Sequence, residues 1–161
     1  MKNNKIVALQ ITHGDLSELP ESIGELESLE ELFLYCNKIK NLPETIGNLK
    51  LLKKLHLQVN KLEVLPNSIS NLASLKELLI EANNLKEVPD SIGDLRELKI
   101  LGLEENRLEF IPETIANFHK LKNLRLDNND LKELPESISQ LSELENLNLE
   151  SNKIIKIPDS I

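Results

Sequence analysis

The sequence is poor in cysteine and in aromatic residues. Among its 161 residues Cys36 is the one cysteine, tryptophan is missing, and the aromatic side chains are Phe33, Tyr35, Phe110 and Phe118. A lone cysteine cannot form an internal disulfide, so the fold does not depend on an oxidising compartment. With so few large rings, we expect a core that consists mainly of leucine and isoleucine.

Long apolar runs and an excess of positive charge are also missing. No apolar stretch reaches the roughly 18 residues of a transmembrane helix, and the first residues, MKNNKIVAL, lack the apolar core of a signal peptide. The chain as written is therefore expected in the cytoplasm, or outside the cell if a signal peptide has been removed. The formal net charge of −8 and the lack of a run of Lys and Arg argue against nucleic acid as a partner.

A tandem repeat dominates the sequence. It is marked by seven prolines, each 23 positions after the one before, Pro20, Pro43, Pro66, Pro89, Pro112, Pro135 and Pro158. A fixed period of this length is typical of solenoids, in which each unit stacks on its neighbours. We expect a single domain over residues 1–161, with seven repeats that start near residues 6, 29, 52, 75, 98, 121 and 144, the last one incomplete.

The first half of each repeat predicts a short strand. Leucine or isoleucine occupies the first, fourth and sixth positions, as in Leu98, Leu101 and Leu103. Side chains two residues apart point to the same side of an extended chain, so the fourth and sixth residues face a core. The ninth position is Asn in six repeats and Gly14 in the first. We expect these asparagines to stack and to hydrogen-bond the backbone where the chain bends.

The second half of each repeat predicts a short helical turn. It reads Leu-Pro, a polar residue, Ser or Thr, then Ile, and apolar residues follow at a spacing of three, as in Ile115, Phe118 and Leu121. Proline fixes its own φ and suits the first residue of a helical turn. The spacing favours a 3₁₀ or short helical segment with one buried stripe. A small residue for close packing recurs at one position, as Gly24, Gly47 and Gly93.

The combined pattern, L-x-x-L-x-L-x-x-N-x-L running on into L-P-x-[ST]-I-x-x-L over residues 6–161, resembles a leucine-rich repeat. The 23-residue form with Leu-Pro is similar to that of bacterial leucine-rich-repeat proteins and of the intracellular Ras-group proteins. The resemblance implies an α/β fold, a right-handed horseshoe solenoid with a concave parallel β-sheet and short helical or 3₁₀ segments on the convex side. It also implies protein binding as the usual function.

In such a fold the third, fifth, seventh and eighth positions would line the concave face, with equivalent residues of adjacent repeats about 4.8 Å apart. Apolar and aromatic side chains gather there in the first five repeats. Clusters of this kind on an open surface are typical of binding hot spots, although single exposed apolar residues are common on any protein. The predicted patch consists of Phe33, Tyr35, His56, Val59, Leu79 and Ile100.

An acidic row occupies the seventh position of the later repeats. It consists of Glu81, Glu104, Asp127 and Glu150, and Arg125 lies beside it. Like charges in register on adjacent strands repel each other. The row therefore predicts either a basic partner or cation, or a solvated acidic surface in which Arg125 relieves the repulsion.

Side chains for catalysis or metal binding are few. His13 and Cys36 share the eighth position of adjacent repeats, and with His56 they form a weak set of zinc ligands that lacks a fourth member. An open sheet offers a nucleophile neither oxyanion donors nor a pocket that excludes water. We therefore expect no enzyme, no cofactor and no resident metal.

The sequence thus predicts a protein–protein interaction module that recognises a protein partner through its concave face. One form of this function is an exported bacterial protein that binds host or surface proteins, and an intracellular signalling scaffold is an alternative. A further alternative is a structural protein that forms homo-oligomers through an uncapped C-terminal end. The apolar residues expected near that end are Leu147, Leu149, Ile154, Ile157 and Ile161.

Overall fold

The computed structural model describes residues 5–161, and along this part of the chain short strands alternate with 3₁₀ helices. The strands are β1 (Ala8–Gln10), β2 (Glu31–Phe33), β3 (Lys54–His56), β4 (Glu77–Leu79), β5 (Ile100–Gly102), β6 (Asn123–Arg125) and β7 (Asn146–Asn148). The helices are η1 (Glu21–Glu25), η2 (Glu44–Asn48), η3 (Asn67–Asn71), η4 (Asp90–Asp94), η5 (Glu113–Asn117) and η6 (Glu136–Gln140). Each strand contains the fourth-position leucine of its repeat, as the spacing predicts.

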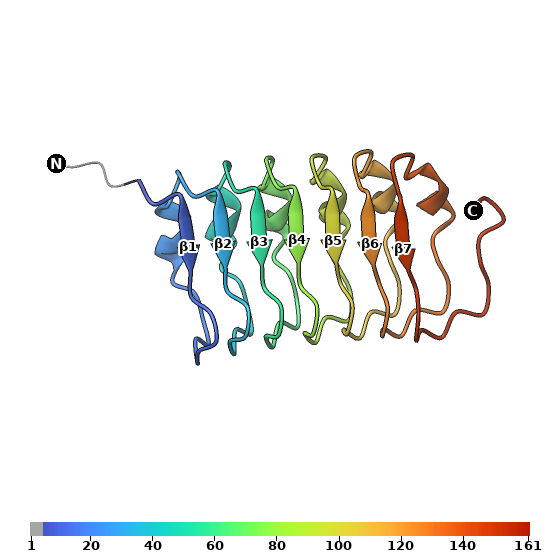
Figure 1. Ribbon diagram of the computed structural model, residues 1–161, viewed down its shortest axis with the longest axis horizontal. Helices are drawn as coiled ribbons and strands as arrows, with labels where there is room; N and C mark the ends of the chain where they lie inside the picture. Colours follow the sequence, from blue (N-terminus) through green and yellow to red (C-terminus); the bar gives the residue numbers. More distant parts are fainter. Residues whose placement is uncertain (1–4) are drawn as a thin grey trace.

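The seven strands form one parallel sheet in the order β1-β2-β3-β4-β5-β6-β7. Equivalent residues pair across it, so that Leu55 in β3 lies between Leu32 in β2 and Leu78 in β4. Figure 1 shows the strands side by side along the long axis of the molecule, with the helices behind them. The predicted solenoid is therefore confirmed. No helix within residues 5–161 has the length and apolar character needed to cross a membrane.

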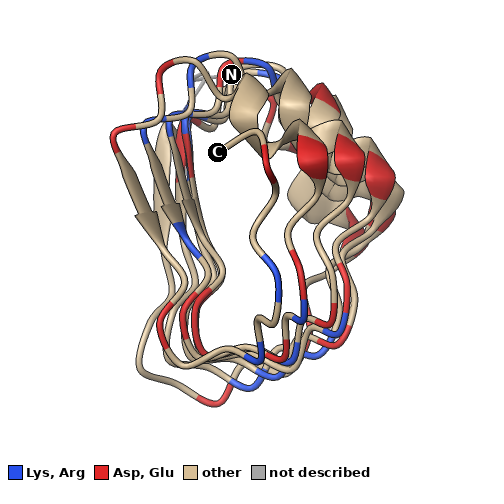
Figure 2. Ribbon diagram, turned by 90° about the vertical axis from the view of Figure 1, so that its right-hand side faces the viewer, with Lys and Arg blue, Asp and Glu red and all other residues tan. Residues whose placement is uncertain are grey.

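The core lies between the wall of strands and the wall of helices (Figure 2). Leu98, Leu101 and Leu103 are at most 2% exposed, and the repeats on either side cover them. Phe118, which follows η5, is 1% exposed and is the largest fully buried side chain. Leucine and isoleucine supply most of the other buried apolar residues, so the expected aliphatic core is confirmed.

The ninth-position asparagines join each repeat to the one before it. Asn83 Nδ2 donates hydrogen bonds to the carbonyl of Ile80, 2.9 Å away, and to that of Leu57, 3.0 Å away in the preceding repeat. Asn83 Oδ1 accepts one from the backbone N–H of Leu62, 2.9 Å away. The same arrangement recurs at Asn60, Asn106, Asn129 and Asn152. The predicted asparagine ladder is confirmed.

The residue before each ladder position has a left-handed backbone. Its φ lies between 54° and 57° at His13, Cys36, Val59, Ala82, Glu105, Asn128 and Ser151. This conformation turns the chain sharply after each strand and brings the asparagine amide under the backbone it binds. Non-glycine residues seldom adopt it, and a β-branched residue such as Val59 is the least suited of all.

Each helix begins directly after its proline. Pro89 is extended, with φ −66° and ψ 148°, and its carbonyl accepts a hydrogen bond of 2.9 Å from the N–H of Ile92. Proline is therefore the residue before the helix, and the expectation that it is the first helical residue is wrong by one position. The extended ψ of proline explains the shift, because a residue inside a 3₁₀ helix needs a small negative ψ.

The Ser or Thr of the motif ties successive helices together. Thr114 Oγ1 donates to the carbonyl of Asp90 at 2.8 Å, and Thr45 Oγ1 donates to that of Glu21 at 2.7 Å. A Cβ on Gly93 would lie 2.5 Å from the carbonyl oxygen of Thr114. At Gly93 this close approach leaves no room for a side chain, in agreement with the packing role predicted for a small residue at this position.

Candidate functional site

The solvent side of the sheet carries the predicted site residues. In each central strand the middle leucine is buried, and the residues on either side of it point away from the core; in β2 these are Glu31 and Phe33, which flank Leu32. We call the surface formed by the third, fifth and seventh positions the sheet face. It corresponds to the concave face expected from the sequence.

Four ring side chains of the first three repeats pack edge to face. The rings of Phe33 and His56 lie with their centroids 4.8 Å apart, and those of His13 and Tyr35 lie 5.2 Å apart. We call these four residues the ring cluster. Phe33, Tyr35 and His56 are each half-buried, so the rings hold one another in place and still present surface to the solvent.

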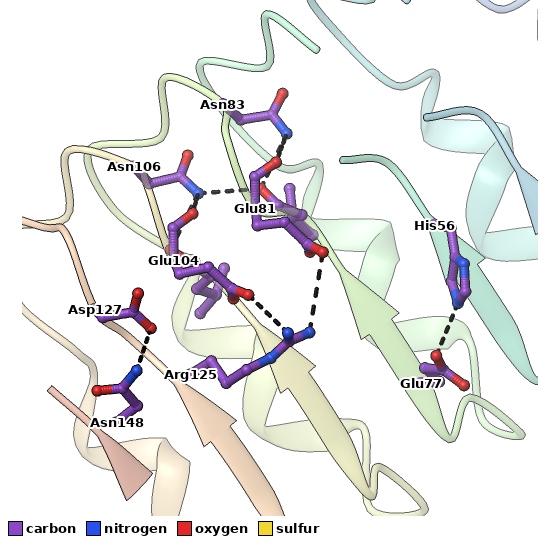
Figure 3. Close-up of polar contacts among 11 residues, drawn as sticks. His56, Glu77, Glu81, Asn83, Glu104, Asn106, Arg125, Asp127 and Asn148 are labelled. Atoms are coloured by element: carbon purple, nitrogen blue, oxygen red, sulfur yellow. Dashed lines mark hydrogen bonds and ion pairs between the residues drawn. The ribbon is translucent and has the colours of Figure 1, made fainter. Parts of the chain in front are cut away.

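A carboxylate fixes one ring of this cluster. His56 Nε2 lies 3.0 Å from Glu77 Oε1, and the side chains are 16% and 24% exposed respectively (Figure 3). Glu77 was not among the site residues predicted from the sequence. The contact could have been predicted from the repeat pattern, because the third position of one repeat lies diagonally across from the fifth position of the repeat before it.

The middle of the predicted apolar patch differs from the expectation. Leu79 is 8% exposed and lies in register between His56 and Gly102. The prediction of an exposed anchor is therefore wrong for Leu79, and its contact with a partner stays a prediction. Val59 is 50% exposed at its left-handed bend, and Ile100 in β5 is half-buried.

Further along the sheet, Arg125 bridges two members of the acidic row. Its Nη1 lies 2.9 Å from Glu104 Oε1, and its Nη2 lies 3.9 Å from Glu81 Oε1 (Figure 3). Gly102 makes this possible, because a Cβ there would lie 3.0 Å from Arg125 Nη2 and 3.1 Å from the Oε2 atom of each glutamate. The missing side chain opens a notch in β5 that the guanidinium and both carboxylates fill.

The two carboxylates of this notch have hydrogen-bond or ion-pair partners in the described structure for only one of their two oxygens. The Oε2 atoms of Glu81 and Glu104 are buried, and neither has a hydrogen-bond partner among residues 5–161. Burial, together with the charges of Glu81 and Asp127, raises the pKa of Glu104, while its own backbone N–H and Arg125 act in the opposite direction. A dehydrated pair of acids with one guanidinium between them has capacity for a further positive charge.

The next member of the row is held by amides. Asn148 Nδ2 donates to Asp127 Oδ1 at 2.9 Å, and Asn128 Nδ2 donates to Asp127 Oδ2 at 3.0 Å. The electrostatic repulsion predicted for the acidic row is thus reduced at three of its positions, by Arg125 at Glu81 and Glu104 and by these two amides at Asp127. This arrangement agrees with the interpretation in which Arg125 reduces repulsion, and it leaves a partner role open.

The three weak metal candidates are not brought together as a ligand set. His13 packs on Tyr35, His56 binds Glu77, and Cys36 lies half-buried at a left-handed bend. Across the described part of the chain, no group of three His, Cys, Asp or Glu side chains could hold a metal ion. The geometry therefore gives these candidates no support.

A column of lysines along the starts of the strands was missed by the sequence analysis. Lys53, Lys76, Lys99 and Lys122 occupy the second position of four successive repeats. The backbone N–H of each donates to the carbonyl of the preceding one, at 2.9, 2.8 and 2.9 Å. A search for runs of Lys and Arg cannot find this column, since its members are a full repeat apart, but reading down the second position would have found it.

Comparison with known proteins places these features in a family. The leucine-rich repeat region model matches residues 5–84, and the leucine rich repeat model matches residues 73–131 and 96–154. No curated protein sequence matches the chain. Many solved structures do match, and all three described next are considerably longer than this chain.

A leucine-rich-repeat protein of Leptospira interrogans is 37% identical, with a TM-score of 0.68 over 91% of this chain and 43% of its own. An internalin of Listeria monocytogenes is 26% identical, with a TM-score of 0.82 over 94% of this chain and 43% of its own. The plant peptide hormone receptor RGFR1, solved in complex with RGF2, is 33% identical, with a TM-score of 0.82 over 95% of this chain and 26% of its own. This chain thus spans less than half of each.

Proposed function

Because the chain belongs to the leucine-rich repeat family, we propose that it is a protein-interaction module whose sheet face binds a protein partner. The observation that carries the proposal is the ring cluster. Its rings are pre-positioned by edge-to-face packing and by the contact between His56 and Glu77, so little side-chain freedom is lost when a partner covers them. Half-buried aromatic rings on an open surface are the usual anchors of protein interfaces.

The notch around Gly102 supplies the second part of the proposed interface. Glu81, Glu104 and Asp127 would select a partner with a positively charged group, and Ile100 and Arg125 would border the contact. The two carboxylate oxygens without hydrogen-bond partners support this assignment. Apolar anchors in the first repeats and acids in the later ones would also fix the orientation of the partner along the sheet.

For the biological setting, we propose an exported bacterial protein that binds host or surface proteins. The similarity to a Leptospira interrogans protein and to a Listeria monocytogenes internalin supports this setting. The similarity to a plant receptor solved with RGF2 supports recognition of a peptide or protein ligand. An intracellular signalling scaffold is the alternative setting, and it would use the same sheet face.

The test compares partner capture by three immobilised proteins, which are the wild type, the double variant Phe33→Ser/Tyr35→Ser, and a control, Val64→Ser/Phe110→Ser. The control removes two side chains that are 53% and 49% exposed and that lie outside the sheet face. Proteins from cell and matrix extracts captured by the wild type and the control, but not by the ring variant, would support the proposal. Equal capture by all three folded proteins would contradict it.

Self-association is the second candidate function. It is favoured by the exposure of apolar side chains in the last repeat, where Ile155 is 89% exposed, Ile157 57% and Ile161 62%. If this candidate is correct, light scattering over a concentration series will show a rising mass that Ile155→Ser/Ile157→Ser abolishes. A monomeric mass at every concentration would contradict it and leave the sheet-face proposal intact.

A further inference from the structure

The lysine column differs in charge from the rest of the molecule. The segments that lead into the four central strands, residues 50–54, 73–77, 96–100 and 119–123, carry eight Lys or Arg side chains and two glutamates, whereas the whole chain has a net charge of −8. Figure 2 shows basic residues at the bends that enter the strands, together with some acidic ones. Positive charge is thus collected along one edge of the sheet.

Geometry makes the column a defined strip. Three consecutive backbone hydrogen bonds hold Lys53, Lys76, Lys99 and Lys122 one above another, so their side chains leave the backbone at the spacing of parallel strands, about 4.8 Å. Like charges at this spacing repel each other. Holding four lysines in register therefore costs the folded state electrostatic free energy. A negatively charged partner bound to the column would remove this repulsion.

The two ends of the column are neutralised and its middle is not. Lys53 Nζ lies 2.5 Å from Glu30 Oε2, and Lys122 Nζ lies 2.6 Å from Glu145 Oε1. Lys76 and Lys99 are both exposed, and neither forms an ion pair within the described residues.

The acid on which both of these lysines act, Glu97, is already engaged. Glu97 binds Lys120, with their charged atoms 2.7 Å apart. The hydrogen bond and charge of Lys120, with smaller contributions from Lys76 and Lys99, lower the pKa of Glu97. One carboxylate therefore faces three lysines, and the middle of the column keeps an excess of positive charge.

We propose that the lysine column is a docking strip for an acidic helical segment of a protein partner, with Lys76 and Lys99 as its central contacts. Glutamates three or four residues apart on a helix stand about 5–6 Å apart, close to the spacing of the column, whereas alternate residues of a strand stand about 6.7 Å apart. Nucleic acid fits less well, because its affinity comes from the number of phosphates that Lys and Arg neutralise, the column holds four lysines, and the net charge of −8 repels a long polyanion.

This strip is separate from the ring cluster and the Gly102 notch. The second position is three residues from the fifth along the strand direction, about 10 Å, and five residues from the seventh, about 16 Å, so the strip borders one edge of the sheet face and the acidic row borders the other. The failure of one proposal therefore leaves the other standing.

The experiment uses the full chain and a fluorescein-labelled, alanine-rich helical peptide with four glutamates one turn apart, and a glutamine version of that peptide as a blank. Fluorescence anisotropy at low salt should show saturable binding of the glutamate peptide. The variant Lys76→Glu/Lys99→Glu should bind about tenfold more weakly or worse. The control Lys61→Glu/Lys86→Glu changes the net charge equally at two exposed lysines outside the column and should bind like the wild type.

Three results would overturn the proposal. One is the lack of saturable binding by the wild type to the glutamate peptide. Another is an equal loss in both double variants, which would show a response to net charge and not to the column. The third is tighter binding of a single-stranded DNA of equal charge at the same salt concentration, which would assign the strip to nucleic acid. Circular dichroism establishes that each variant is folded.

Discussion

The side-chain amide of Asn83 accepts a hydrogen bond of 2.9 Å from the backbone N–H of Leu62, one repeat earlier. Its Nδ2 donates to the buried carbonyls of Ile80 in its own repeat and Leu57 in the repeat before, and at 3.3 Å to that of Glu81. Asn83 is 7% exposed, so water cannot replace these contacts without opening the structure. Each repeat is held to its neighbour by side-chain hydrogen bonds of this kind in addition to apolar packing.

The variant Asn83→Ala should therefore lower the free energy of unfolding by about 3 kcal/mol, because it leaves an N–H and two carbonyls buried without this partner. Asn152→Ala removes the same contacts from the last repeat, where they are partly exposed, and should cost about half as much. Urea denaturation followed by circular dichroism measures both. Equal losses at the two positions would show that burial does not set the strength of the ladder.

Val59 occupies a left-handed position, with φ at 54°. A left-handed L-residue costs about 1–2 kcal/mol, and asparagine, which stands at the equivalent Asn128, tolerates it best after glycine. Val59→Asn should therefore raise the free energy of unfolding by about 1 kcal/mol. The control Val64→Asn changes an equally exposed valine outside the left-handed set and should shift stability by less than about 0.5 kcal/mol. A destabilised Val59→Asn would contradict the strain interpretation.

Two glycines should respond very differently to substitution by alanine. A Cβ at Gly93 would lie 2.5 Å from a backbone oxygen of the next helix segment, so Gly93→Ala should cost about 3 kcal/mol or more. A Cβ at Gly102 would meet only the ends of flexible side chains, at 3.0–3.1 Å, and Gly102→Ala should change stability by less than about 1 kcal/mol. Thermal unfolding measures both, and a larger loss at Gly102 would be the contrary result.

The titration of Glu104 should contribute to the pH dependence of the free energy of unfolding. Burial raises the pKa of Glu104 above its ordinary value of 4.5. The folded state then holds this proton to higher pH than the unfolded chain, so the contribution of Glu104 to stability falls as pH rises from below 4.5 through the raised pKa. Glu104→Gln cannot titrate. The stability of the wild type minus that of this variant should decrease between about pH 4 and pH 7.

Asp15 provides the matched control for this experiment. A hydrogen bond from Lys38 and the charge of Lys38 lower the pKa of Asp15 below its ordinary value of 3.8. Its contribution is therefore present above that value and is lost only in stronger acid. The difference between the wild type and Asp15→Asn should show no matching decrease over the same range. A decrease of equal size in both series would indicate a general charge effect in place of the burial of Glu104.

Much of the fold follows from residues that recur at the same position of every repeat. The alternation of Leu98, Leu101 and Leu103 places a strand, and the proline that follows marks the turn toward a 3₁₀ segment. The asparagine ladder was also predictable, because a buried bend needs donors and acceptors that only a polar side chain supplies. The site was predictable in part. Phe33 and His56 meet as expected, whereas Leu79 is covered, and the contacts of Arg125 could not be foreseen.

The sequence by itself determined the period, the strand positions and the aliphatic core, because each of these depends on the backbone and on the apolar or polar character of a residue at a fixed position. Only the tertiary structure decided which side chains of different repeats meet. Arg125 reaches Glu81 because Gly102 leaves the intervening strand bare, and lysines from four successive repeats become neighbours because their backbones hydrogen-bond in register. Such contacts depend on the length and direction of each side chain and on what its neighbours leave open.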